Sequence, residues 1–127
     1  MANVTMNNKQ KFNFVKQSKR QTNVMGMTGM FKFTGTADET LTVPIACEVI
    51  DAWCVQTGAG GSGDTVTLKN GSDALTDAMD CNKSDNAVTR VGSIIDQYST
   101  FAAGDSLFCD RASAANCDVY VLVELLD

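Results

Sequence analysis

A chain of 127 residues, 44% of them apolar, has room for one domain with a single hydrophobic core. It contains no histidine, which excludes Ser-His-Asp and Cys-His nucleophiles, histidine metal sites and the usual general base near neutral pH. Charges or Pro44 interrupt every apolar run well short of a membrane span, and no nucleotide-binding glycine motif occurs, so we expect no enzyme, cofactor, metal, small-molecule substrate or membrane partner.

The first 26 residues are polar, basic and rich in Asn and Gln. Through Ala37 the chain has six Lys and Arg and no acid, a charge of +6, whereas the remainder carries −11, which gives −5 overall. Phe12 and Phe14 would share one face of an extended strand, because side chains alternate along a strand. We expect residues 1–26 to form an extended arm and residues 27–127 to form the folded body.

Three interpretations of this basic segment stay open: a solvated tail, an arm that binds nucleic acid, and an arm that docks on an acidic partner protein. Asn and Gln dilute the lysines, which makes nucleic acid an unlikely partner. The alternation of Phe12 and Phe14 favours docking, because it gives the arm apolar side chains to bury. The predicted docking residues are Lys9, Lys11, Phe12, Phe14, Lys16, Lys19 and Arg20.

The first long strand pattern covers residues 41–55. Its alternation predicts one shared face, with Asp51 as an exception, for Leu41, Val43, Ile45, Cys47, Val49, Trp53 and Val55. Pro44 cannot donate a ladder hydrogen bond, so the strand enters at an edge or bends there. Trp53, the only tryptophan, is expected to anchor a core or an interface.

A flexible glycine-rich loop is predicted at residues 57–64, followed by a hairpin at 65–79. Asn70 and Gly71 supply the positive φ values that a tight turn needs, and the second arm fits a strand or a helical turn. A further strand is expected at residues 86–95. The pattern of residues 94–101 fits a strand or a short helix, and a turn at Gly104 then leads into another strand.

The last strand, residues 117–126, is apolar on both faces. Its second face carries Tyr120, Leu122 and Leu126, which predicts a central or a subunit-facing strand. We expect these three residues to form an oligomer interface. Short strands with Gly, Asn and Asp turns and no long amphipathic helix indicate an all-β fold. We expect a single β-sandwich, jelly-roll-like domain with the basic N-terminal arm attached.

Five cysteines are an odd number, and no C-x-x-C pair is present. The interpretation we favour is reduced cysteines that act as small core hydrophobes. The alternative is a bridge between Cys109 and Cys117, which flank a predicted hairpin loop. Five aspartates between Asp64 and Asp85 are interpreted as turn-forming and solvated rather than as a calcium site, since EF-hand spacing is absent.

The stretches VPIACEVIDAWCVQTGAGGSGDTVTLKNGSDALTDAM, AAGDSLFCD and VYVLVELL resemble small structural proteins of tailed bacteriophages. They are most similar to capsid decoration, or cement, proteins, over roughly residues 40–126. The resemblance implies a β-sandwich or tulip-like body, often a homotrimer, on the outer capsid surface. Terminal arms would reach across neighbouring subunits of the major capsid protein. It also implies a virion protein made in a bacterial cytoplasm, in agreement with the lack of a recognisable signal peptide.

Two other classes of function remain possible at this point. A trimeric phage spike or fibre module that binds host carbohydrate would need exposed aromatic residues on loops, and residues 57–64 have none. A small β-barrel that binds nucleic acid would need aromatic platforms beside a positive groove. The body has few aromatic residues and a charge of −11 after Ala37, so we consider this class less plausible.

Overall fold

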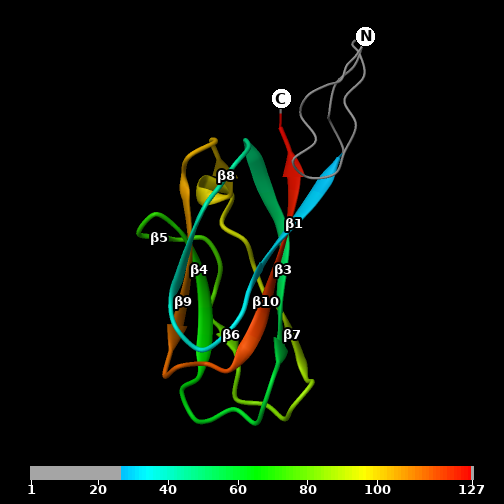
Figure 1. The fold of residues 1–127 in the computed structure, drawn as a ribbon, viewed down its shortest axis with the longest axis vertical. Helices are drawn as coiled ribbons and strands as arrows, with labels where there is room; N and C mark the ends of the chain where they lie inside the picture. Colours follow the sequence, from blue (N-terminus) through cyan, green and yellow to red (C-terminus); the bar gives the residue numbers. More distant parts are fainter. Residues whose placement is uncertain (1–26, 127) are drawn as a thin grey trace.

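Two antiparallel sheets pack face to face in the computed structural model, which describes residues 27–126 (Figure 1). Sheet A contains, in order, β1 (Thr28–Phe33), β10 (Cys117–Leu125), β3 (Cys47–Gln56) and β7 (Val88–Arg90), with β8 (Thr100–Phe101) also paired to β3. Sheet B contains β2 (Glu39–Thr42), β9 (Ser106–Ala112), β4 (Thr65–Asn70) and β5 (Asp73–Ala74), with β6 (Met79–Asp80) also paired to β4. The predicted all-β sandwich is confirmed.

The core lies between the two sheets and follows from the alternation of each strand. In β10 every second residue from Cys117 to Leu125 is buried, and the residues between them are half-buried. β4 and β9 supply the facing side chains, among them Val66, Leu68 and Leu107, all fully buried. β10 lies between β1 and β3, so the central strand that its two apolar faces predicted is confirmed (Figure 1).

Pro44 marks a change of sheet. The strand expected over residues 41–55 is divided into β2, at the edge of sheet B, and β3, inside sheet A. Between them Val43 is fully buried, and its backbone pairs with the turn before β9: the Val43 N–H donates to the Asp105 carbonyl at 2.8 Å. A proline at this point removes no ladder hydrogen bond, so Pro44 is tolerated where the chain passes from one sheet to the other.

A β-bulge in β3 overturns the predicted face of Trp53 and Val55. The pairing with β10 shifts between Leu122 and Val123, so Ile50 is the extra residue on β3. Beyond the bulge the alternation is reversed, and Ala52, Cys54 and Gln56 are buried instead. The bulge leaves Asp51 at the surface side, where its carboxylate accepts the Ala52 N–H at 2.8 Å. Burying this charge would cost far more than one irregular ladder position.

The connections between strands follow the expected turn chemistry in most places. Gly71, with φ of 64°, opens the β4–β5 loop, and Gly104, with φ of 96°, lies in the turn before β9. Asn70 remains in the strand, so it does not share the positive φ that was predicted for it. The second arm of this hairpin is strand rather than helix, interrupted between β5 and β6.

Residues 94–101 combine both structures that their pattern allowed, because the 3-10 helix η1 (Asp96–Tyr98) leads directly into β8.

Three of the aspartates between Asp64 and Asp85 accept backbone N–H groups of nearby turns, at 2.9–3.1 Å. They are Asp64, Asp77 and Asp80, and this is the turn role that we predicted. Among residues 27–126 no helix is long and apolar enough to cross a membrane.

Candidate functional site

Four side chains form a row across the outer face of sheet A, one from each neighbouring strand. The strand register places Lys32 beside Tyr120, Tyr120 beside Trp53, and Trp53 beside Arg90. The two rings are stacked, with centroids 5.8 Å apart and planes 15° from parallel. Lys32 Nζ lies 5.3 Å from the Tyr120 centroid, and Arg90 Cζ lies 5.1 Å from the Trp53 centroid. The row is therefore a stacked aromatic pair held between two cations.

Acidic neighbours fix both ends of this row. Arg90 forms an ion pair with Asp51, the residue that the bulge keeps outward, and Lys32 Nζ lies 3.8 Å from an oxygen of Asp118. Each pair is partly exposed and contributes at most about 1 kcal/mol to the free energy of folding. Their larger effect is on geometry, because they hold the cations over the aromatic rings. Both signs of charge thus alternate along one face.

Apolar side chains surround the row and remain open to solvent. Met30 is 48% exposed, Ile50 43% and Val88 53%, while Val55 and Leu122 are half-buried. An antiparallel sandwich normally presents polar residues on its solvent face. Apolar side chains gathered on one sheet face, with an aromatic centre and charged neighbours, are typical of a protein-binding surface. We call these residues and the row together the outer face of sheet A.

The outer side of sheet B is different. Its central strands β4 and β9 present Thr65, Thr67 and the Lys69–Asp110 ion pair, whose charged atoms lie 2.8 Å apart. Phe108 is half-buried on this side, beside an open hollow that is otherwise lined by Thr40, Lys69, Gly71, Ser72 and Ser106. This polar surface is what a solvated sheet face requires, so the outer face of sheet A is the candidate interaction surface.

Two of the three residues predicted for an oligomer interface lie on this surface. Tyr120 belongs to the row, and Leu122 lies between Met30 and Asp51 in the register. Leu126 is half-buried directly after β10, where its N–H donates to the Ala46 carbonyl at 2.9 Å. The seven predicted docking residues of the arm lie outside the described residues.

Sequence reasoning missed Lys32, Arg90, Val88 and the outward position of Trp53. Alternation alone placed Trp53 with Cys47 and Val49, because a bulge leaves no direct mark in the period of a strand. The signal was Asp51, the one charged residue on an otherwise apolar face. When this acid moves to the outer face, each later residue of β3 lies on the face opposite to the one that alternation predicted.

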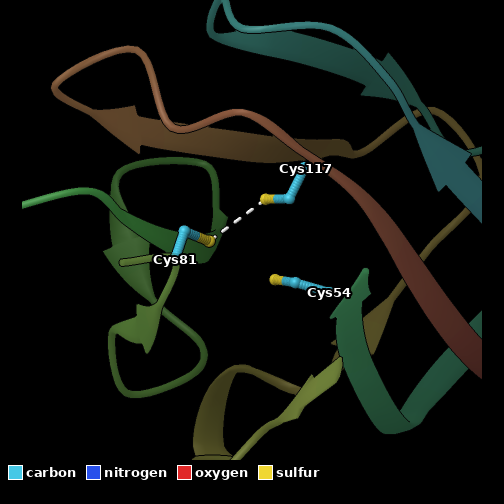
Figure 2. A group of neighbouring side chains, drawn as sticks. All are labelled: Cys54, Cys81 and Cys117. Atoms are coloured by element: carbon cyan, nitrogen blue, oxygen red, sulfur yellow. Dashed lines mark hydrogen bonds between the residues drawn. The ribbon is translucent and has the colours of Figure 1, made fainter. Parts of the chain in front are cut away.

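A second feature lies inside the sandwich, where three cysteine side chains meet (Figure 2). Cys54 comes from β3, Cys81 follows β6, and Cys117 begins β10; their sulfurs all lie within 4.8 Å of one another. We call these three residues the thiol cluster. All five cysteines are buried, as core hydrophobes should be. Cys117 lies against Cys81, with the sulfurs 3.1 Å apart, rather than against Cys109.

Arg111 of β9 extends to this cluster and is only 6% exposed. Its Nη1 donates to the carbonyls of Ala115 and Cys117, at 2.9 and 2.7 Å, and lies 3.7 Å from the Cys117 sulfur. Its Nε and Nη2 atoms have no hydrogen-bond partner. A buried guanidinium is costly without a negative charge nearby. The Cys117 sulfur lies beside it and would supply that charge as a thiolate.

The pKa values of the three cysteines in the cluster are shifted in opposite directions. Interactions with the neighbouring thiols of Cys54 and Cys81, and with Arg111, lower the Cys117 pKa well below its usual 9.0. The interaction with Cys117 raises the pKa of Cys54 and of Cys81. Burial raises the pKa of both Cys47 and Cys109 to about 11.

This arrangement predicts an unusual pH dependence of stability. Between pH 6 and 8 Cys117 is deprotonated in the folded chain and protonated in the unfolded one. The free energy of unfolding should then rise by about 1.4 kcal/mol per pH unit. The contribution of Cys117 to the free energy of unfolding is complete above pH 9 and is lost as the pH falls toward the lowered pKa. Urea unfolding at pH 6, 7 and 8, with reductant and chelator, measures this slope.

The range from pH 6 to 8 suits this measurement because the chain has no histidine that would titrate in it. Cys117→Ala should flatten the slope, whereas Cys109→Ala, which removes a thiol that is protonated in both states, should preserve it. A wild-type protein whose stability does not change across this range would show that Cys117 keeps its proton.

Comparison with known proteins adds no relative to this picture. The chain matches no protein-family model, no curated protein and no solved structure.

Proposed function

We propose that this protein is a non-catalytic structural protein of a virion, which binds the outer surface of a tailed-phage capsid and stabilises its lattice. The observation that carries the proposal is the outer face of sheet A. Its aromatic–cation row lies among exposed apolar side chains, in a fold whose other sheet has a polar outer surface. Such a face serves binding and needs no catalytic group.

A second copy of the chain is the occupant that best suits the outer face of sheet A. The face carries Lys32 and Arg90 beside Asp51 and Asp118, so around a three-fold axis the cations of one subunit can meet the acids of the next. Burying the apolar residues between subunits stabilises by about 25 cal/mol per Å² before ordering costs. A homotrimer is the state that the resemblance to decoration proteins implies.

The capsid role follows from mass action. A protein that binds the assembled lattice but not its separated subunits stabilises the lattice. An oligomer that presents several arms gains avidity without any strong single contact. Residues 1–26 precede β1 in the chain, and β1 is the edge strand of the described part of sheet A, next to the proposed subunit interface.

Sedimentation with undecorated capsids of the virus that encodes the chain tests this function. We expect the protein to co-sediment saturably and to raise the temperature at which the capsids disrupt. Binding to disassembled capsid subunits with equal affinity, or no binding to capsids at all, would refute the proposal.

Self-association can be tested without a capsid. Light scattering after size exclusion should give about three times the chain mass of 13.6 kDa at tens of micromolar protein. Leu122→Asp should produce a folded monomer, because it places a charge in the middle of the apolar interface. Phe108→Asp, a matched change on the outer side of sheet B, should leave the oligomer intact. A monomeric wild-type protein at this concentration would contradict the interface.

A further inference from the structure

Three cysteine sulfurs gather at one place in the core, and the side chains of the thiol cluster are directed toward one another (Figure 2). The sulfur of Met79, in β6, lies 3.7 Å from one of them, the Cys54 sulfur. Zn–S bonds of about 2.3 Å in a tetrahedron place neighbouring sulfurs about 3.8 Å apart. The spacing between the Cys54 and Met79 sulfurs already has this value. The Cys81 and Cys117 sulfurs, 3.1 Å apart, would have to separate by about 0.7 Å, and the three cysteine sulfurs all lie within 4.8 Å of one another.

Charge balance also favours a metal at this position. Three bound thiolates carry −3, and the buried Arg111 supplies +1 only 3.7 Å from Cys117. A divalent cation would bring the whole group to neutrality, which a dry core requires. The Nε and Nη2 atoms of Arg111 have no hydrogen-bond partner, so negative charge at the neighbouring cluster would offset part of the cost of burying the guanidinium.

We propose that Cys54, Cys81, Cys117 and Met79 form a site for one thiophilic divalent cation of the Zn²⁺ class, with Arg111 balancing the thiolate charge. The proposal departs from the sequence expectation of no metal. That expectation rested on ligand spacing, whereas Cys81 and Cys117 are 36 residues apart and meet only in the folded chain.

The metal would join the two sheets. Cys54 and Cys117 belong to β3 and β10 of sheet A, whereas Met79 and Cys81 lie in and directly after β6 of sheet B. Binding requires the thiols of Cys54 and Cys81 to release their protons, so affinity should fall as the pH falls. All four residues are at most 2% exposed, so the metal should load during folding rather than enter the folded core.

The test follows from this loading route. Reduced full-length protein is unfolded in denaturant and refolded with an excess of Zn²⁺, or of Co²⁺ as a spectroscopic probe, and unbound metal is then removed. We expect one metal per chain by native mass spectrometry, a thiolate-to-cobalt charge-transfer band with the visible bands of tetrahedral Co²⁺, and a higher melting temperature than the metal-free protein.

The chain provides its own matched controls. Cys54→Ala, Cys81→Ala and Cys117→Ala should each weaken binding by about 100-fold or more, whereas Cys47→Ala and Cys109→Ala, equally buried but outside the cluster, should bind like the wild type. Met79→Leu keeps the volume and removes the thioether, so it should weaken binding by about tenfold and shift the cobalt spectrum. Circular dichroism of each metal-free variant separates lost binding from lost folding.

Three results would overturn the site. One is a folded wild-type protein that takes up no Zn²⁺ or Co²⁺. Another is equal loss of binding in the Cys47 and Cys109 variants. The third is a disulfide between Cys81 and Cys117 in protein purified without reductant, detected as fewer than five alkylated thiols after denaturation and located by peptide mapping.

Discussion

Removal of residues 1–24 is expected to abolish binding to capsids and to leave a folded, associated body with a nearly unchanged melting temperature. The truncation keeps β1, whose Phe31 and Phe33 are part of the core. It removes five of the six cations that precede the first acid. The remaining chain has five bases and fifteen acids, a charge of −10, which an acidic capsid surface would repel.

Salt dependence separates the two contributions of the arm. Charge attraction is screened within about 8 Å at physiological ionic strength, whereas apolar contacts are not. Phe12→Ala combined with Phe14→Ala should therefore lose more binding at high salt than substitutions of Lys9 and Lys11 do. Capsid sedimentation across a salt series measures both. If the truncated protein decorates capsids as well as the full chain, the arm is a solvated tail.

Gly60→Ala is expected to destabilise the body by about 3 kcal/mol, the upper end of the range for overpacking. A Cβ at Gly60 would collide with the carbonyl oxygen of Cys81 and would lie 2.8 Å from the Asn82 Cα. These are backbone atoms, so no side chain can move aside. The Gly60 N–H also donates to the Lys83 carbonyl at 2.8 Å, which fixes the two segments together. Urea unfolding at constant pH measures the loss.

Gly61→Ala is the matched control in the same loop. A Cβ there would have Asp64 oxygens as its nearest neighbours, at 3.7 Å or more, which is ordinary contact. We expect a change within about 0.5 kcal/mol. Equal effects at the two positions would mean that the loop does not pack on residues 81–83 as described. The same packing lies next to Cys81, so Gly60→Ala should also weaken metal binding at the thiol cluster.

The sequence by itself determined the fold class and the position of most strands along the chain. Gly71 and Gly104 at turns, the absence of a helical period and, outside the bulge in β3, the period-2 alternation are local signals, and they were correct because they depend on neighbouring residues only. The two apolar faces of β10 likewise indicated a central strand. Alternation along β10 was enough to place Tyr120 and Leu122 together on the face opposite Cys117.

Only the tertiary structure decided which residues form the two candidate sites. The bulge at Ile50 turned Trp53 outward, and pairing across four strands then brought Lys32 and Arg90 to the stacked rings. Alternation has a fixed period and carries no record of an inserted residue or of a distant partner. The thiol cluster has the same origin, since its three cysteines come from β3, from the segment after β6 and from β10, and no local spacing connects them. Their meeting depends on how two sheets pack, a property of the whole chain.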